Sequence, residues 1–396
     1  MSRITGHRFL HSPGPTRVPD EVAHAMSRQP MDLADPRVAQ TIAACEDGLR
    51  QVLGTRSDVF MYAANGHGAW EATIVNLLGP GQSVLIAGTG HFSESWAVQS
   101  ESLGANVVRT PWAEGESIDV AAVEKALRDD REHAIVAVFA VHTDTASSLT
   151  SDLVALRAAI DAAGHPALFV VDVVASLAAA PFVMDALRAD VAIGASQKGL
   201  MVPPGLSFVA VNAAAMAIAQ RNPAPRFYWD WVRRQGDMPY RKFCGTPPQS
   251  LLAGLEAALA LIEREGLAEV HARHRLMADA VHAAVGAWSE AGGVRFFGRL
   301  PPTRSVSVTT LLTAPGIDPE AVRAVARERF QVAIAGGLGP LTSRVLRIGH
   351  LGDTNPAMIL GCLGGLQAAF QVCGVPIGSD GVRRAVEVFA RSAAQG

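Results

Sequence analysis

The sequence has 396 residues, of which 49% are hydrophobic and 18% charged, so it can bury a large core and is not an intrinsically disordered chain. Its 34 basic and 37 acidic residues give a net charge of −3 without any basic stripe, so nucleic acid and anionic membranes are not expected partners. Only three of the cations are lysines, namely Lys125, Lys198 and Lys242.

Cysteine usage and the N-terminus both point to the cytoplasm. The four cysteines form no CxxC pair, so we expect neither a disulfide framework nor a metal site. Residues 1–15 lack the apolar core of a signal peptide. Nowhere do about 18 apolar residues run uninterrupted, so no transmembrane helix is expected.

The first half of the chain is predicted to form an α/β domain. Residues 12–15, Ser-Pro-Gly-Pro, favour an extended lead-in. Short apolar runs then alternate with helical patterns such as 150–163, which indicates a mainly parallel sheet covered on both faces. The predicted strands lie at 83–87, 135–141, 167–173, 191–195 and 206–211.

After residue 212 the pattern changes. Two proline-bearing loops flank the segment 226–231, and long helical patterns follow at 249–266 and 268–288. Shorter runs then predict strands at 306–311 and 345–348 and helices at 319–329 and 356–372. We therefore predict an N-terminal arm at 1–14, a large domain at 15–265 and a small α+β domain at 266–396.

Two glycine turns follow predicted strands. Asn65-Gly66-His67-Gly68 opens a helix, and Gly88-Thr89-Gly90 follows the next strand. Glycines let a backbone approach an anion closely, and the free N–H groups of a helix start can hold a phosphate. Each turn alone is equally consistent with a tight strand-to-helix connection.

Two charged residues lie at the ends of apolar strands, where open parallel sheets bind their ligands. Asp172 in Phe-Val-Val-Asp-Val-Val is costly to bury without a cation or a donor, and a cap or a structural ion pair would also explain it. Lys198 lies in the uncharged run Ala-Ser-Gln-Lys-Gly-Leu, where desolvation lowers a lysine pKa and frees the amine for Schiff-base chemistry. A lysine extending from a loop into solvent is the alternative. Lys125 lies on a solvated helix face, and Lys242 lies in a polar loop with a possible phosphate role.

A strand-end aspartate, a later strand-end lysine and an upstream anion site together match the needs of pyridoxal 5′-phosphate (PLP), which requires an amine, a carboxylate for the pyridine nitrogen and a phosphate site. The sequence also resembles the class V PLP-dependent aminotransferases of fold type I, in the alanine/serine/aspartate–glyoxylate group. The resemblance covers nearly the whole chain and rests on the segments 13–16 (Pro-Gly-Pro-Thr), 65–68, 171–176 (Val-Asp-Val-Val-Ala-Ser), 194–205 (Gly-Ala-Ser-Gln-Lys-Gly-Leu-Met-Val-Pro-Pro-Gly), 336–340 and 346–352 (Leu-Arg-Ile-Gly-His-Leu-Gly).

The resemblance implies roles for individual residues around the cofactor. Lys198 would form the internal aldimine and carry the substrate α-proton, and Asp172 would bind the pyridine nitrogen. Val174 and Phe92 would cover the two ring faces, Phe92 where the family often has tryptophan. Thr145 would lie near the phenolate oxygen, and the phosphate pocket would be lined by Asn65, Gly66, His67 and Gln197.

Other implied roles concern the substrate and a second subunit. Arg347 would bind the substrate α-carboxylate as a planar fork, and Gly14 would lie beside the substrate. Thr246 would reach the phosphate of a neighbouring subunit, which implies a homodimer with shared active sites. Phe243 belongs to the same cofactor-binding group, although many relatives carry a phosphate-binding tyrosine there.

The sequence departs from the family pattern elsewhere too. Ser147-Ser148 replaces the usual Thr-Gly pair. Arg17 stands where glyoxylate aminotransferases commonly have asparagine, and it either faces the substrate and favours an anionic side chain or points into solvent.

The function implied is transfer of an amino group from a small amino acid of the serine, alanine or aspartate type to glyoxylate or pyruvate. One alternative is a PLP-dependent lyase or desulfurase, which would need a mobile nucleophilic cysteine. Another is a non-catalytic PLP-binding regulatory protein, which the presence of both Lys198 and Arg347 disfavours. A nicotinamide dehydrogenase is disfavoured because neither glycine turn has the GxGxxG pattern.

Overall fold

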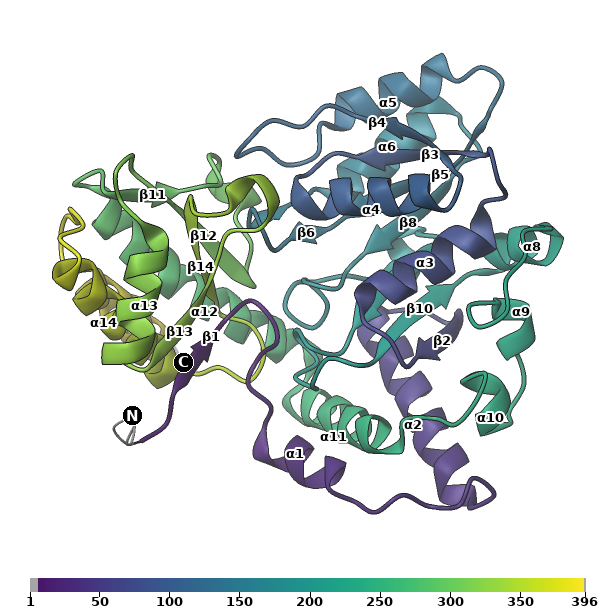
Figure 1. Ribbon diagram of the computed structural model, residues 1–396, viewed down its shortest axis with the longest axis horizontal. Helices are drawn as coiled ribbons and strands as arrows, with labels where there is room; N and C mark the ends of the chain where they lie inside the picture. The colour runs from purple at the N-terminus through teal and green to yellow at the C-terminus, as the bar shows by residue number, and fades with distance from the viewer. Residues whose placement is uncertain (1–5, 395–396) are drawn as a thin grey trace.

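The computed structural model describes residues 6–394 and contains a seven-stranded and a five-stranded β-sheet (Figure 1). The larger sheet has the strand order β2-β10-β9-β8-β5-β3-β4, and all neighbours are parallel except β10, which is antiparallel to β2 and β9. The expected mainly parallel sheet is therefore confirmed. Its strands are β2 (Asp58–Tyr62), β3 (Ser83–Ala87), β4 (Asn106–Arg109), β5 (Ile135–Val141), β8 (Leu168–Asp172), β9 (Val191–Ala195) and β10 (Ser207–Val211).

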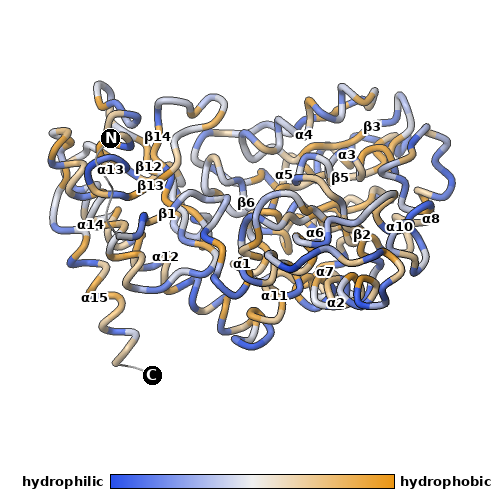
Figure 2. The backbone as a smooth tube through the Cα atoms, turned by 60° about the horizontal axis from the view of Figure 1, so that its bottom comes forward, coloured by the Kyte–Doolittle hydropathy of each residue, from blue (hydrophilic) through white to orange (hydrophobic). Residues whose placement is uncertain are grey.

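Both faces of this sheet are buried because apolar residues occupy every position of β5, and β8 and β9 depart from this only at Asp172 and Gly194. In β5, Val138 and Ala140 pack into one hydrophobic cluster, while Phe139 and Val141 point to the other face and join a second cluster. Apolar backbone segments accordingly run through the interior in Figure 2. The covering helices are α2 (Pro36–Leu53), α3 (Gly66–Leu77), α4 (His91–Ser102), α5 (Val120–Asp129), α6 (Leu153–Ala163), α8 (Ala213–Arg221) and α11 (Gln249–Glu265).

The smaller sheet has the order β1-β13-β14-β12-β11 and packs against the C-terminal helices. Its first strand comes from the N-terminal segment and pairs in parallel with β13, which Figure 1 shows as a purple strand beside green ones. The elements are β1 (Phe9–His11), β11 (Val294–Phe296), β12 (Val308–Thr313), β13 (Val332–Gly336), β14 (Val345–Gly349), α12 (Leu267–Ser289), α13 (Pro319–Arg329), α14 (Pro356–Val372) and α15 (Gly381–Ala393).

Short elements complete the chain. They are α1 (Asp20–Met26), the β6–β7 hairpin (Thr143–Asp144 and Leu149–Thr150), α7 (Met184–Leu187), α9 (Trp231–Arg234), α10 (Pro239–Lys242) and two 3₁₀ turns, Pro301–Thr303 and Gly339–Leu341. Within residues 6–394, no helix is long and apolar enough to cross a membrane.

The sequence did not predict that the N-terminal segment contributes a strand, because three residues are too few for a periodic signal. The division of the chain into an arm and two domains stays a prediction. Residues 1–5 of that arm lie outside the described residues.

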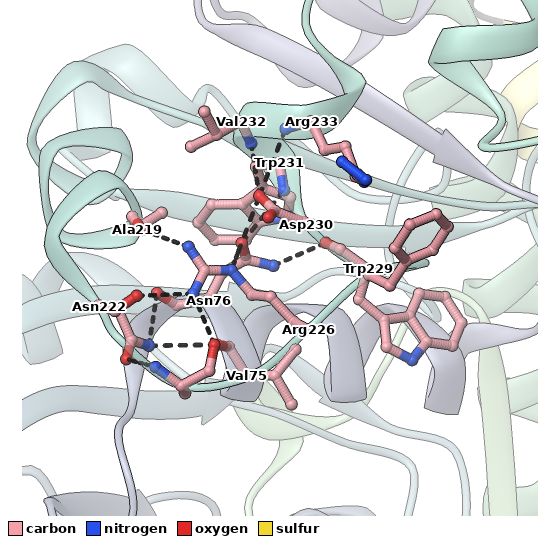
Figure 3. A network of polar contacts seen from close by, with 12 residues as sticks. Val75, Asn76, Ala219, Asn222, Arg226, Trp229, Asp230, Trp231, Val232 and Arg233 are labelled. Atoms are coloured by element: carbon pink, nitrogen blue, oxygen red, sulfur yellow. Dashed lines mark hydrogen bonds and ion pairs between the residues drawn. The ribbon is translucent and has the colours of Figure 1, made fainter.

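The loop segment after α8 is fixed to α3 by a polar network (Figure 3). The Arg226 guanidinium donates to Asn76 Oδ1 at 3.0 Å and to the carbonyls of Asn222 and Ala224, and Asn76 Nδ2 donates to Trp229 O at 2.7 Å. These contacts hold α3 in place, and the first turn of α3 borders the cavity described next.

Candidate active site

A cavity of about 270 Å³ opens where β5, β8 and β9 end, at the carboxyl edge of the large sheet. This is the edge at which open α/β sheets bind ligands. The structure brings ten of the sequence-predicted site residues together here. They are Gly14, Asn65, Gly66, His67, Phe92, Thr145, Asp172, Val174, Gln197 and Lys198, and they are joined by Pro15, Trp70, Val141, Thr143, Ala175 and Pro204.

Lys198 follows β9, and its amine donates a hydrogen bond to the carbonyl of Pro13. Gly14 has a φ of +111°, and a Cβ there would lie 2.6 to 2.8 Å from the last three atoms of the lysine side chain. A glycine is therefore required beside this amine. Burial, followed by the charge of Arg347, lowers the pKa of Lys198 to about 8, although two carboxylates act in the opposite direction.

Asp172 is the last residue of β8, and both of its carboxylate oxygens are held in place. Oδ2 accepts from Trp70 Nε1 at 2.6 Å, and Oδ1 accepts from the backbone N–H of Val174 at 2.7 Å. Burial raises the pKa of this carboxyl to about 6, and these hydrogen bonds oppose that rise. A cation placed beside Asp172 would hold it ionised.

At another part of the cavity wall, the first turn of α3 presents backbone N–H groups. Asn65 is the N-cap, and its Oδ1 accepts from Gly68 N at 3.3 Å. Gln197 Oε1 is buried without a hydrogen-bond partner in the described chain. The N–H groups of this helix start can bind an anionic group, and the unused Gln197 oxygen can accept from a polar group that carries a donor.

Aromatic side chains form another wall. The rings of Trp70 and Phe92 lie 6.3 Å apart in an edge-on arrangement, and Trp70 stacks on Trp96 at 5.1 Å. Trp70 is buried and lies one turn into α3, so its position is fixed both by packing and by Asp172. A flat ligand therefore has an apolar wall on this side.

Arg347 on β14 reaches toward the cavity from the small sheet without lining it. Nε donates to Gly336 O at 2.5 Å and Nη1 donates to Thr145 O at 2.8 Å, while Nη2 has no hydrogen bond within residues 6–394. Burial lowers the pKa of Arg347 to about 10, so the guanidinium stays charged at neutral pH.

Three predicted residues lie away from the cavity. The Arg17 side chain is 48% exposed and pairs with Asp20 at 3.5 Å. Phe243 is buried beside another cavity next to β2, and Thr246 is exposed. Their roles in cofactor or substrate binding stay predictions.

Comparison with known proteins identifies the family. The model of the class V aminotransferase family matches residues 8–347. The chain belongs to the class V aminotransferases. It is 37% identical over 382 residues to the serine–glyoxylate aminotransferase of Methylorubrum extorquens, covering 95% of this chain and 94% of the relative. It is 35% identical over 395 residues to the L-aspartate–glyoxylate aminotransferase of Paracoccus denitrificans, covering 99% and 98%. The crystal structure of ureidoglycine–glyoxylate aminotransferase from Bacillus subtilis superposes with a TM-score of 0.88 at 25% identity, covering 98% of this chain and all of that one.

This class V aminotransferase is a PLP-dependent enzyme of fold type I, as the resemblance in its sequence implied. The residues of the cavity fit that cofactor: an amine with a lowered pKa, a carboxylate with a fixed orientation, an apolar wall and a helix start whose N–H groups can bind the phosphate. When bound, PLP supplies the electron sink that labilises bonds at the α-carbon of an amino acid.

Sequence reasoning missed two polar contributors and the carbonyl that binds the lysine. Trp70 follows Gly66 at helical spacing, which could have placed its indole on the cavity side of α3. Asp144, whose charge acts on both Lys198 and Arg347, and the Pro13 carbonyl gave no sequence signal. None of the four cysteines lines the cavity, so the structure offers no nucleophile there for a desulfurase.

Proposed function

We propose that this aminotransferase moves the amino group of a small amino acid to glyoxylate. The observation that carries the proposal is the convergence of Lys198 and Asp172 in one cavity, with the Arg347 guanidinium held beside it by Thr145. An amine, a carboxylate and a guanidinium at those places meet the needs of amino-acid chemistry on PLP.

Each residue has one task in this proposal. The Lys198 amine holds the cofactor and then moves the α-proton, which requires the neutral amine, and its lowered pKa increases the neutral fraction near neutral pH. Asp172 stays ionised beside the pyridine nitrogen, and Trp70 and Val174 fix its orientation. The N–H groups of the first turn of α3 and the amide NH₂ of Gln197 hold the phosphate, and Phe92, Val174 and Thr145 hold the ring.

Arg347 is proposed to bind the donor's α-carboxylate. Two of its nitrogens already donate to carbonyls, which leaves Nη2 for a carboxylate oxygen. Because the guanidinium is buried, a charge-assisted hydrogen bond there is stronger than it would be in solvent.

The proposed substrates follow from the relatives. Serine and L-aspartate are the donors named for the two curated relatives, and glyoxylate is the acceptor named for both and for the solved structure. We therefore propose glyoxylate over pyruvate, with serine, alanine and aspartate as candidate donors. Arg17 is the candidate determinant for an acidic donor.

A half-reaction screen tests this function. Each amino acid is added alone to the PLP-loaded protein, and the visible absorbance of the bound cofactor is followed. A donor shifts the spectrum, and glyoxylate then restores it while pyruvate does so more slowly. If no amino acid shifts the spectrum, the proposal is wrong. Comparing Arg17→Asn with wild type on aspartate and on alanine tests Arg17, because equal losses with both would remove its role in specificity.

We also propose that the enzyme is a homodimer in the cytoplasm. Phe227, Met238 and Tyr240 expose 62%, 68% and 60% of their surface in the segment that leads to Thr246. A second copy covering these side chains would bring Thr246 to a neighbouring cofactor, as the sequence predicts. Light scattering should give twice the 41.6 kDa chain mass. Thr246→Ala should weaken cofactor binding if the two sites are shared.

A further inference from the structure

A carboxylate that the proposed function leaves without a task lies directly behind the cavity. Asp144 is fully buried in the short hairpin after β5, and no cation lies within ion-pair distance of it in residues 6–394. Its oxygens instead accept three backbone N–H groups, from Phe92 at 2.8 Å, Ala146 at 2.8 Å and Ser147 at 3.1 Å. Burying a carboxylate that has only neutral hydrogen-bond donors is energetically costly, so the presence of Asp144 at this position needs an explanation.

The three donors belong to the segments that build two walls of the site. Phe92 lies in the first turn of α4 and lines the cavity with its ring. Ala146 and Ser147 follow Thr145, whose side chain lines the cavity and whose carbonyl accepts from Arg347 Nη1. One carboxylate therefore connects the aromatic wall to the arginine that comes from the other sheet.

We infer that Asp144 is a positioning residue for the transamination: it fixes Phe92 against the cofactor ring and the Thr145 turn beneath Arg347. The inference rests on the proposed use of Arg347 for the donor's carboxylate. Asp144 contacts neither substrate nor cofactor in this assignment and acts through the groups it holds.

The charge of Asp144 supports the same assignment. It raises the pKa of both Lys198 and Arg347, while burial raises its own. The ionisable groups that influence it are Asp172, Lys198, Arg347 and His91. Asp144 and Asp172 together balance the two cations, so removal of one negative charge leaves the site with a net positive charge.

The first variant removes the charge of Asp144 and one of its two acceptor oxygens. Asp144→Asn keeps the size and one acceptor oxygen, which can serve either the Ala146–Ser147 turn or Phe92 but not both, because the amide NH₂ faces the remaining N–H. We expect the KM for the amino donor to rise about tenfold, with kcat falling less than about threefold, because the lost hydrogen bonds orient binding groups. Hydrogen exchange in the cofactor-free chain should quicken at the Phe92 amide.

A second readout requires no amino donor and therefore separates this inference from the substrate assignment. The rate of PLP association with the cofactor-free chain depends on the neutral Lys198 amine and should have its midpoint near the lysine pKa of about 8. Asp144→Asn should move that midpoint to lower pH. Asp144→Glu keeps the charge one methylene away, so it should retain the midpoint while still raising KM, and it serves if the amide variant fails to fold.

Asp190 provides the matched control. Its carboxylate also accepts a backbone N–H, from Phe169 at 2.7 Å, but it precedes β9 at the opposite edge of the sheet. Asp190→Asn should leave the KM, the pH midpoint and Phe92 exchange unchanged. If Asp144→Asn behaves like wild type in all three, or if Asp190→Asn reproduces its effects, the assignment is overturned.

Discussion

Two cavities of similar size contain cations, yet only one is suited to chemistry. The active-site cavity measures about 270 Å³, and a second one of about 300 Å³ lies beside the edge strand β2. In the second, Lys242 Nζ lies 2.6 Å from Glu46, and the buried Arg234 donates to three backbone carbonyls. Lys242 and Arg234 thereby hold the 234–243 segment against α2 and the sheet.

In the active-site cavity the charged groups are close without being paired. Lys198 and Arg347 form no ion pair within the described part of the chain, and burial lowers the pKa of both. A lysine that is ion-paired stabilises the fold, whereas a desolvated lysine amine whose only partner is a carbonyl can act as a nucleophile. The ion pairing of the lysine, and not cavity size, distinguishes the two regions, because Arg234 and Arg347 both donate to backbone carbonyls.

Replacing the lysine of each cavity by alanine should give the largest difference in turnover between these regions. Lys198→Ala removes the amine, so we expect turnover to fall by about 10³-fold or more and the visible absorbance of bound cofactor to change. Lys242→Ala removes one ion pair and should keep turnover within about threefold of wild type. Steady-state kinetics on both variants checks this, and multiple turnover by Lys198→Ala would show that the amine is not essential.

Crowding the lysine without removing it should have the next largest effect. Gly14→Ala places a methyl group within 2.8 Å of the amine, so the side chain has to move. We expect kcat to fall about 10²-fold while PLP still binds, because displacements of about 1 Å have effects of that size. Gly266→Ala is the control: its φ is also positive, at +89°, but only Glu269 lies within 4 Å of the added methyl. Equal losses in both variants would attribute the effect to backbone strain.

The pH dependence of PLP association should show a smaller effect than these two substitutions. Association of PLP with the cofactor-free protein should quicken nearly tenfold per unit below pH 8 and level off above it, since the neutral amine is the nucleophile. The pKa of Lys198 is about 8 in the folded chain against 10.5 for a free lysine. The unfolded chain therefore binds more protons between these values, so the contribution of Lys198 makes the fold more stable as pH rises through that window. A profile centred near 10 would contradict a desolvated amine.

The sequence was sufficient where a signal is local. Apolar runs predicted β3, β5 and β9 with their observed bounds, and positions at or just beyond strand ends identified Asp172 and Lys198. The parallel sheet then made their meeting in one cavity a matter of topology.

Contacts between distant segments were not predictable in this way. Trp70 lies 102 residues from Asp172, and Asp144 lies 52 residues from Phe92, so neither hydrogen bond leaves a pattern in the sequence. The Pro13 carbonyl reaches Lys198 only because β1 joins the small sheet and fixes the chain that follows it. Such contacts depend on tertiary packing, which local secondary-structure propensity does not report.

The smallest effect is expected where the sequence departs from its relatives. Phe243 is buried beside β2 in the cavity that Glu46 and Lys242 also line, away from the active-site cavity, so Phe243→Tyr should change the affinity for PLP by less than about threefold. Phe182→Tyr adds the same hydroxyl at another buried phenylalanine that lies away from both cavities. Titration of the cofactor-free variants with PLP measures both affinities. If Phe243→Tyr alone binds PLP about tenfold more tightly, the region beside β2 contributes to a cofactor site after all, and the contrast between the two cavities holds only within a single chain.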